Sequence, residues 1–290
     1  MKRRFVLGSG TLITLLALAG IWGPREPREF AAKWLERRWL VLTGGLVDAG
    51  GHKLRIERMG KGSPTVVFES GLAQPRNMWG TVPGEVAKYT RVVIYERAGI
   101  NGSDLAPTPR TITDLVEDLH RLLKNAEVGG PYVLVGHSIG GLNVRLFASK
   151  YPEEVAGLVL VDSSHEDEYQ RIGELLTPAA KEGYLKHEGG GNPERVDLLA
   201  GASQLKGSAP LKEMPIIVLS APGNDNPATG GTRGAQVHNE LQASFQSLFP
   251  HSTRILVEKS GHFIQLDQPE IVADSISQVV QWARQKMTVK

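Results

Sequence analysis

The chain of 290 residues contains no cysteine. This absence excludes disulfide bonds, a thiolate nucleophile and metal sites that depend on thiolate ligands. The chain also lacks a strong excess of one charge, because 33 basic and 31 acidic side chains give a formal net charge of +2. Apart from two N-terminal clusters, the basic residues are dispersed. A nucleic-acid partner is therefore not expected, since such a partner requires a basic surface.

The N-terminus combines positive charge with a long apolar run. Basic residues 2–4 precede the apolar residues 5–22, and Ala17 and Ala19 offer small side chains of the kind found at cleavage sites. This pattern is typical of an export signal, but the run is also about as long as a membrane-spanning helix. We therefore expect residues 1–22 to be a signal peptide or a membrane anchor that associates the protein with a membrane. Either alternative places the catalytic part outside the cytoplasm, in the periplasm or the extracellular space.

The remainder of the chain divides into a linker and one large domain. Residues 23–50 mix tryptophan and leucine with arginine, and we interpret them as an amphipathic linker. In residues 51–290, strand-like apolar runs alternate with amphipathic helix-like runs, without an internal repeat. The expected fold class is α/β, with a mostly parallel central sheet and helices on both faces. The expected strands are 52–58 at a half-buried edge, 65–68, 91–95, 132–135, 158–161, 216–219 and 254–257, and the expected helices are 111–124, 142–151, 235–249 and 269–286.

The alternation of strands and helices stops after residue 162. Residues 163–213 are polar, helix-forming in patches and interrupted by the Gly-Gly-Gly-Asn-Pro run at 189–193. A segment of about fifty residues between two core strands is too long for a turn, and lids over active sites occupy such positions. We therefore interpret residues 163–213 as a lid insertion between two late strands.

The Gly-His-Ser-Ile-Gly run at residues 136–140 is the most informative motif of the chain. It lies directly between the predicted strand 132–135 and the predicted helix 142–151. A serine on such a tight turn adopts a strained backbone conformation that only small flanking residues permit. The turn exposes the hydroxyl of Ser138 at the edge of the sheet and at the start of a helix, which identifies Ser138 as the candidate nucleophile.

A serine hydroxyl is a weak nucleophile at neutral pH, so Ser138 needs a base and an acid that orients the base. His262 is the candidate base, because it follows the predicted strand 254–257 and so emerges at the same edge of the sheet as Ser138. The other histidines fit less well, because they point along the turn, lie on early elements or in the insertion, or flank a surface helix: His137, His52, His120, His165, His187, His238 and His251.

Two aspartates compete for the role of the acid. Asp225 follows the predicted strand 216–219, in a loop rich in glycine, proline and asparagine. Asp162 ends the predicted strand 158–161, one strand nearer to the nucleophile. A carboxylate from either strand can hold the tautomer of His262, provided that its oxygens reach the ring nitrogen. Both alternatives therefore stay open on the pattern of these residues alone.

Acyl transfer also requires hydrogen-bond donors for the developing oxyanion. The backbone N–H of Ile139, directly after the nucleophile, is one expected donor. The second is the N–H of Leu72, in the Glu-Ser-Gly-Leu run at 69–72 that follows an early strand. Related hydrolases often carry His-Gly at this place. Here Ser70 replaces the histidine, which leaves the backbone donor in place but removes a side chain that commonly braces the loop.

Together, these residues resemble the α/β-hydrolase superfamily over nearly all of residues 51–286. The run Tyr-Glu-Arg-Ala-Gly-Ile-Asn-Gly-Ser at 95–103 is similar to the Asp-Arg-x-Gly-x-Gly-x-Ser loop of the family, with Glu96 in place of aspartate and Ala98 in place of glycine. The Gly-His pair at 261–262 is similar to the histidine loop of the family. The resemblance implies an α/β-hydrolase fold of the serine-nucleophile, esterase-like branch.

A finer resemblance concerns exported or membrane-anchored bacterial members of the superfamily. These members share stretches similar to residues 69–72 and to the Val-Asp-Ser-Ser-His-Glu-Asp run at 161–167. The likeness slightly favours Asp162 over Asp225 as the acid.

We therefore expect a serine hydrolase that cleaves a carboxylic ester, or less readily an amide, of a small or apolar substrate through an acyl-enzyme on Ser138. Neither a cofactor nor a metal ion is expected. A perhydrolase or haloperoxidase-like activity is an alternative, because the same triad can accept peroxide in place of water. A ligand-binding member of the fold without catalytic activity is a further alternative.

Overall fold

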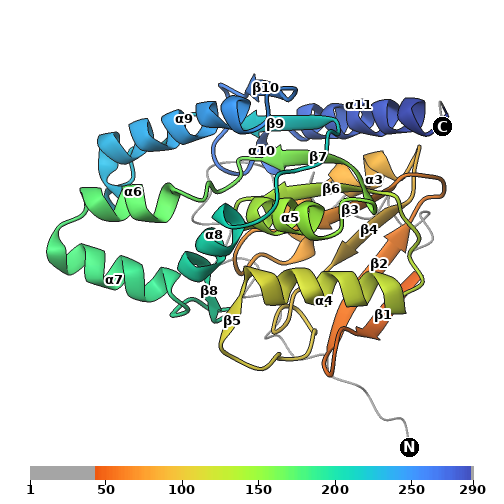
Figure 1. The fold of residues 1–290 in the computed structure, drawn as a ribbon, viewed down its shortest axis with the longest axis horizontal. Coiled ribbons are helices and arrows are strands. Elements are labelled where there is room, and N and C mark those ends of the chain that lie inside the picture. Colours follow the sequence, from red (N-terminus) through yellow and green to blue (C-terminus); the bar gives the residue numbers. More distant parts are fainter. Residues whose placement is uncertain (1–42, 289–290) are drawn as a thin grey trace, which may run out of the picture. The chain divides into compact units, whose positions relative to one another are not determined.

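The computed structural model describes residues 43–288 and contains, among these residues, a sheet of eight strands (Figure 1). The strands are β1 (Thr43–Asp48), β2 (Lys53–Met59), β3 (Thr65–Glu69), β4 (Val92–Tyr95), β6 (Tyr132–His137), β7 (Val155–Val161), β9 (Ile216–Ser220) and β10 (Thr253–Leu256). They lie in the order β1-β2-β4-β3-β6-β7-β9-β10. Only the pairs β1-β2 and β2-β4 are antiparallel, so the predicted mostly parallel sheet is confirmed.

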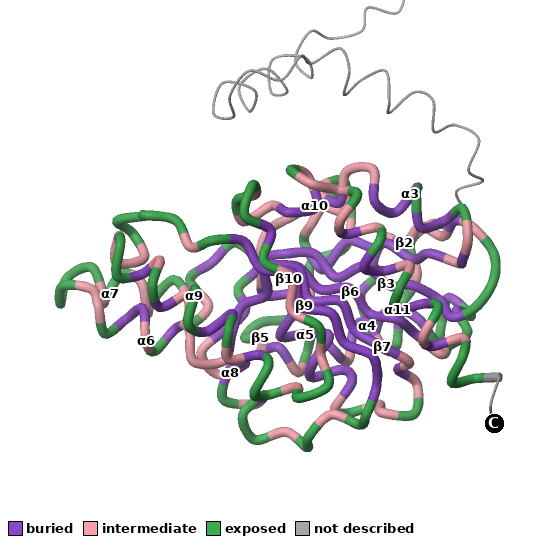
Figure 2. Tube along the Cα trace, turned by 90° about the horizontal axis from the view of Figure 1, so that it is seen from above, coloured by how far each residue is buried: buried purple, intermediate pink, exposed green. Residues whose placement is uncertain are grey.

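The central strands are continuous apolar runs, as a parallel sheet with two covered faces requires. Every residue of β3, β4, β6 and β9 is buried. Figure 2 shows these strands as the buried centre of the molecule, with exposed residues confined to the periphery. The expected strands and the observed ones agree to within a few residues at each end, because the apolar runs define them.

Helices cover both faces of the sheet. On one face lie α4 (Ile112–Asn125), α5 (Ile139–Lys150) and α8 (Leu198–Lys206), which share one apolar core with the sheet. On the other face, α3 (Val82–Val86) and α11 (Pro269–Thr288) form a second core. The predicted apolar face of α4 is confirmed, because its leucines are all buried: Leu115, Leu119, Leu122 and Leu123.

The insertion between β7 and β9 is largely helical, as its composition predicts. It contains α6 (Glu168–Leu175), α7 (Pro178–Glu188), the short strand β8 (Val196–Asp197) and α8. β8 pairs with β5 (Arg110–Thr111), so the insertion is tied to the segment before α4. α6 packs against α9 (Gly231–Leu248), and α6, α7 and α9 extend together to one side of the sheet (Figure 1). The remaining helices are η2 (Arg76–Trp79), η3 (Pro227–Thr229) and α10 (Ile264–Asp267).

The start of the domain differs from the expectation. β1 lies within residues 23–50, which the sequence predicts as a linker, and it pairs with β2 at the edge of the sheet. The strand predicted at 52–58 is therefore the second strand and not the edge. β1 gives a weak strand signal in the sequence, because it contains two glycines and glycine is uncommon inside strands. Gly44 is needed at its position, because a Cβ there would lie 2.1 Å from the carbonyl oxygen of Ile56.

The predicted signal peptide or membrane anchor at residues 1–22 lies outside the described residues and stays a prediction, as does export from the cytoplasm. Within residues 43–288, no helix combines the length and the hydrophobicity that crossing a membrane requires.

Candidate active site

Ser138 occupies the turn between β6 and α5. β6 ends at His137 and α5 begins at Ile139, so the predicted strand, turn and helix are all present. The backbone of Ser138 has φ 55° and ψ −125°, a conformation that residues with a Cβ rarely adopt. Small neighbours are needed, because a Cβ on Gly136 would lie 2.5 Å from the carbonyl oxygen of Gly140. The turn therefore holds a half-buried serine at the N-terminus of α5.

Strand register places Asp162 beside Ser138. β6 and β7 are parallel neighbours in which His137 pairs with Val161, and the residues that follow this pair are Ser138 and Asp162. Asp162 also has a positive φ, of 40°. Strained conformations of non-glycine residues are rare and concentrate at functional sites. Two of them at the ends of adjacent strands mark this edge of the sheet as the candidate site.

The structure brings His262 and Asp162 together. Nδ1 of His262 lies 2.7 Å from Oδ2 of Asp162. The carboxylate is 3% exposed, whereas the imidazole is 38% exposed, so the acid is buried and the ring reaches the surface. A carboxylate at Nδ1 selects the tautomer of the ring and leaves Nε2 directed away from the acid.

Asp225 does not reach His262. Asp225 is exposed in the loop between β9 and η3, and within residues 43–288 no hydrogen bond or ion pair joins it to the histidine. The loop closes on itself, because the N–H of Gly231 donates to the carbonyl of Asn226 at 2.8 Å and the N–H of Ala228 donates to the Asn226 side chain at 3.0 Å. Of the two predicted acids, the structure therefore brings only Asp162 to the histidine.

Asp162 carries its negative charge in a buried position. Burial disfavours the ionised form, but the hydrogen bonds of His238 and His262 outweigh burial and hold the pKa of Asp162 well below its usual range. The N–H of Ala221 also donates to Oδ1 of Asp162, at 2.9 Å. Asp162 is therefore ionised at every pH at which the protein is expected to work.

His137 fixes the loop that carries His262. The ring of His137 is fully buried, and its Nε2 donates to the carbonyl oxygen of His262 at 2.8 Å. Burial is the main cause that lowers the pKa of His137 to about 3, and the neighbouring His262 contributes, so this ring is neutral. The ring centroids of the two histidines are 4.6 Å apart. Because His137 directly precedes Ser138, this contact holds the His262 ring beside the serine turn.

The ring of His262 makes its side-chain hydrogen bond to Asp162. Within residues 43–288, no hydrogen bond joins this ring to the hydroxyl of Ser138. Catalytic hydrogen bonds are often long in the absence of substrate and shorten in the reactive complex. The exposed Nε2 edge of His262 is the part of the ring that can make this bond.

Two backbone donors lie next to the serine turn. The N–H of Ile139 belongs to the first turn of α5, where N–H groups have no intrahelical acceptor. Leu72 follows β3, and its loop passes over the start of α5, because a Cβ on Gly140 would lie 2.3 Å from the carbonyl oxygen of Glu69. Among residues 43–288, neither the N–H of Leu72 nor that of Ile139 has a recorded acceptor. Both groups are therefore available to bind an anion.

Arg97 braces the Leu72 loop at the place where Ser70 replaces the histidine of related hydrolases. The buried guanidinium donates to the carbonyls of Ser70 and Gly71, each at 2.5 Å. It also donates to the carboxylate of Glu69 at 2.6 Å. Since Tyr95 donates to Glu69 as well, the loop is fixed by a buried network of charged hydrogen bonds.

Glu194 completes this network from the insertion. Its carboxylate pairs with Arg97 at 2.7 Å and accepts a hydrogen bond from the N–H of Ala73 at 2.5 Å. Burial disfavours the charge of Glu194, but Arg97 outweighs burial and lowers the pKa of Glu194. The insertion thus contacts the residue next to Leu72. Arg97 belongs to the motif at 95–103, whereas the local sequence around Glu194 carries no signal for this contact.

One of the histidines that fit the role of the base less well in the sequence also contacts Asp162. His238 of α9 lies with Nε2 3.3 Å from Oδ1 of Asp162. Its position on a helix gave no indication of this contact, because the direction of α9 depends on the loop before it. Within the described residues, no cluster of three or more histidine and carboxylate side chains is arranged to hold a metal ion.

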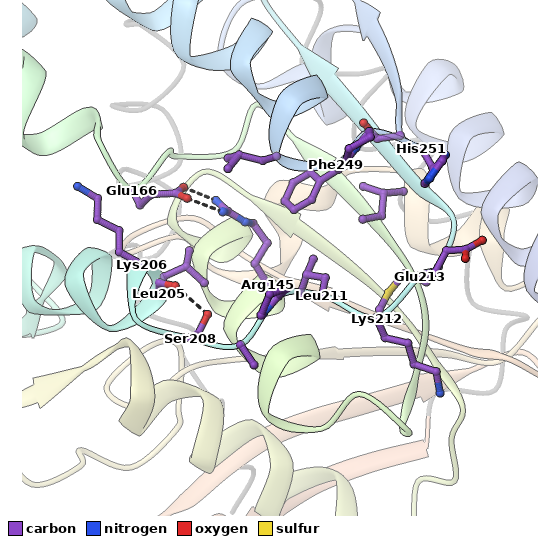
Figure 3. Close-up of a pocket in the computed structure, with 17 residues that line it drawn as sticks. Arg145, Glu166, Leu205, Lys206, Ser208, Leu211, Lys212, Glu213, Phe249 and His251 are labelled. Atoms are coloured by element: carbon purple, nitrogen blue, oxygen red, sulfur yellow. Dashed lines mark hydrogen bonds and ion pairs between the residues drawn. The ribbon is translucent and has the colours of Figure 1, made fainter.

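A cavity of about 560 Å³ lies away from these residues, between α5, the end of α8 and the end of α9. Neither Ser138 nor His262 lines it. Figure 3 shows Arg145 of α5 extending across this cavity to Glu166, with two hydrogen bonds of 2.7 and 2.8 Å. The guanidinium also lies 5.2 Å from the ring centroid of Phe249. The cavity therefore contains a buried ion pair that stabilises the segment following β7.

We expect Glu166→Gln to lower the free energy of unfolding at pH 7 by about 3 kcal/mol, because it leaves the buried charge of Arg145 unpaired. Burial opposes ionisation of Glu166, but Arg145 outweighs burial and lowers the pKa of Glu166 from 4.5 to about 2. The stabilisation is therefore present above pH 4.5 and is lost as the pH falls towards 2. Urea unfolding of both proteins between pH 7 and pH 3 should show the difference shrinking with acidity.

The matched control is Glu153→Gln, because Glu153 pairs with Lys212 at 2.7 Å but is 80% exposed. This variant should differ from the wild type by no more than about 0.5 kcal/mol at any pH. Equal losses in the two variants, or a loss for Glu166→Gln that does not depend on pH, would contradict the assignment.

The comparisons with known proteins agree with this geometry. A family model described as alpha/beta hydrolase fold matches residues 64–187, which include β3, the Leu72 loop and the Ser138 turn. The uncharacterized protein YqjL of Bacillus subtilis strain 168 is 29% identical over 247 residues, which cover 82% of this chain and 91% of YqjL. A protein of Hormonema carpetanum named as a transporter, efuK, is 35% identical over 136 residues, and the chain spans only 20% of its length.

Among solved structures, a thermophilic esterase from Thermogutta terrifontis is similar, with a TM-score of 0.59 and 21% sequence identity. The superposition covers 83% of this chain and 99% of the esterase. At this identity the likeness concerns the fold alone. By its sheet order, its helices on both faces and the family match over residues 64–187, the chain has the α/β-hydrolase fold.

Proposed function

We propose that the protein is a serine hydrolase that cleaves a carboxylic ester of a small or apolar substrate through an acyl-enzyme on Ser138. The observation that carries the proposal is the 2.7 Å contact between Nδ1 of His262 and Asp162, one strand from the strained turn of Ser138. An imidazole held at Nδ1 by a buried carboxylate has the tautomer that accepts a proton at Nε2.

The proposed reaction uses the groups at this edge of the sheet. Ser138 Oγ attacks the carbonyl carbon of the ester, and Nε2 of His262 takes the hydroxyl proton. The N–H groups of Leu72 and Ile139 stabilise the negative charge that develops on the carbonyl oxygen. His262 then donates its proton to the leaving alcohol, and the ionised Asp162 stabilises the imidazolium in between. A water molecule, activated by the same histidine, releases the acid from Ser138.

Two further observations support an ester as substrate. The nucleophile position carries a serine, and a serine alkoxide reacts with a carbonyl group to give an acyl-enzyme that water can resolve. The similar structure from Thermogutta terrifontis is named an esterase. An amide shares the carbonyl group but has a poorer leaving group, so we propose ester cleavage as the faster reaction.

A fluorophosphonate probe tests this proposal without knowledge of the substrate. We expect the folded protein to be labelled at Ser138 at neutral pH, because the oxygen of an activated serine displaces fluoride from the phosphorus of the probe and becomes phosphonylated. Mass spectrometry of the digested protein should locate the adduct on the peptide that contains residues 136–140. The same protein unfolded in urea should remain unlabelled, since the activation depends on His262.

The outcome that would overturn the proposal is equally specific. Folded protein without an adduct on Ser138, under conditions that label a known serine hydrolase in the same tube, would favour a binding protein that retains the fold. An adduct on another serine would move the nucleophile elsewhere in the chain.

A further inference from the structure

The carboxylate of Asp162 lies between two imidazoles. His262 contacts Oδ2 through Nδ1, at 2.7 Å, and His238 lies on the opposite side, with Nε2 3.3 Å from Oδ1. The His238 side chain is 21% exposed. In the reaction proposed above only His262 exchanges a proton with the substrate, so His238 needs a separate explanation.

α9 is fixed in the position that makes this contact. Gln242, one turn after His238 on the same helix, donates from its buried amide to the carbonyl of Ser163 at 2.7 Å. Ser163 directly follows Asp162. Asn239, the residue directly after His238, accepts a hydrogen bond on its side chain from the N–H of Gly223 at 2.9 Å. Two contacts within the turn that follows His238 therefore hold this part of the helix against the segments that follow β7 and β9.

The groups around His238 favour its protonated form. Asp162 faces it from the end of β7, Glu168 from α6 and the His262 ring from the loop after β10, and the backbone of Ala221 accepts a hydrogen bond from it after β9. A neutral imidazole has one N–H and cannot donate to both the carboxylate and the carbonyl, whereas an imidazolium can. Burial lowers the pKa of His238, but the hydrogen bond and charge of Asp162 outweigh burial and raise it above 6.5.

We propose that His238 is a positioning residue for the catalytic acid, in which a positively charged imidazole holds Oδ1 of Asp162 and so presents Oδ2 to His262. The proposal rests on the proposed function of the site. Its second consequence is electrostatic, because the charge of His238 offsets part of the carboxylate charge that attracts a proton to His262.

The substitution His238→Gln separates position from charge, because the glutamine amide can donate to Asp162 but cannot be protonated. When kcat/KM is plotted against pH, its fall on the acidic side, the acidic limb, reports the conversion of the catalytic base to its protonated form. Without the charge of His238, we expect this limb to move to higher pH by roughly one unit for p-nitrophenyl acetate, from the interaction of charges across a carboxylate. The plateau value should stay within about three-fold of the wild type, because the hydrogen bond is retained.

The matched control is His120→Gln. His120 of α4 also pairs with a carboxylate, with Nε2 3.0 Å from Glu154, but Glu154 precedes β7, whereas Asp162 follows the other end of that strand. Its pH profile should coincide with that of the wild type. The proposal would be overturned if the acidic limb of the kcat/KM profile stayed at the same pH in His238→Gln, whether or not the plateau value of kcat/KM fell. A residue with a merely structural role would give this result.

A second measurement does not depend on catalysis. In the NMR spectrum of the wild-type protein, the ring resonance of His238 should titrate above pH 6.5, and in Asp162→Asn its midpoint should fall. A midpoint at or below 6.5 in the wild type would overturn the pairing. If the protein neither cleaves esters nor reacts with a fluorophosphonate, the proposed function fails, and this titration still decides the pairing of His238 with Asp162.

Discussion

We expect Ser138→Ala to lower kcat for p-nitrophenyl ester hydrolysis by roughly 10⁵-fold, because it removes the oxygen that forms the acyl-enzyme in the proposed reaction. The fold should persist, since the turn depends on backbone contacts: the N–H of Ser138 donates to Val161 and its carbonyl accepts from Gly141 and Ser164. Steady-state rates measured beside thermal unfolding by circular dichroism will separate the two effects.

Ser149→Ala is the matched control for this experiment. Ser149 lies near the end of α5, the helix that Ser138 begins, and its hydroxyl donates to the carbonyl of Ala209 at 2.7 Å. Its rates should remain within about two-fold of the wild type, as for other positions remote from the chemistry. If Ser138→Ala retained more than about 1% of the wild-type kcat, a different nucleophile would have to be sought.

The second large effect separates the two aspartates. We expect Asp162→Asn to lower kcat by about 10⁴-fold, because asparagine at this position selects the wrong tautomer of the catalytic histidine. The N–H of Ala221 donates to Oδ1 of Asp162, so the oxygen of an asparagine amide would take that place and its NH₂ group would face Nδ1 of His262. The proton would then reside on Nε2, which could no longer accept one from Ser138.

Asp225→Asn should change kcat by less than about two-fold, since Asp225 is exposed and its loop closes through Asn226 and Gly231. The two variants can be compared at one pH, because Asp162 is ionised throughout the neutral range. A loss in Asp225→Asn that equals or exceeds the loss in Asp162→Asn would reassign the acid. Equal and mild losses in both variants would mean that neither carboxylate orients His262.

The serine turn could be predicted from the sequence because each of its requirements is local. Gly136 and Gly140 are needed for close backbone contacts, and the strand before Ser138 and the helix after it are runs rich in apolar residues. The strands of the sheet and the helices that cover it can be predicted from the same kind of local signal, the periodicity of apolar residues. For such elements the surrounding fold adds packing but does not change the type of structure.

The identity of the acid and its contacts could not be predicted from local sequence. Whether Asp162 or Asp225 meets His262 depends on the positive φ of Asp162 and on the path of a loop whose capping contacts involve Asn226. His238 reaches the acid only because that loop sets the direction of α9. Long-range geometry of this kind leaves no periodic signal in the chain.

The carboxylate of Glu194 has a consequence for protein engineering. Exchanging the segment between β7 and β9 for that of another superfamily member is an obvious route to a new substrate range, because such segments are treated as modular. In this protein the graft would also delete the partner of Arg97 and the acceptor for the Ala73 amide. A chimera would therefore need a transplanted glutamate at the equivalent place, or the loop that carries Leu72, which we propose to bind the oxyanion, would lose its anchor along with the old specificity.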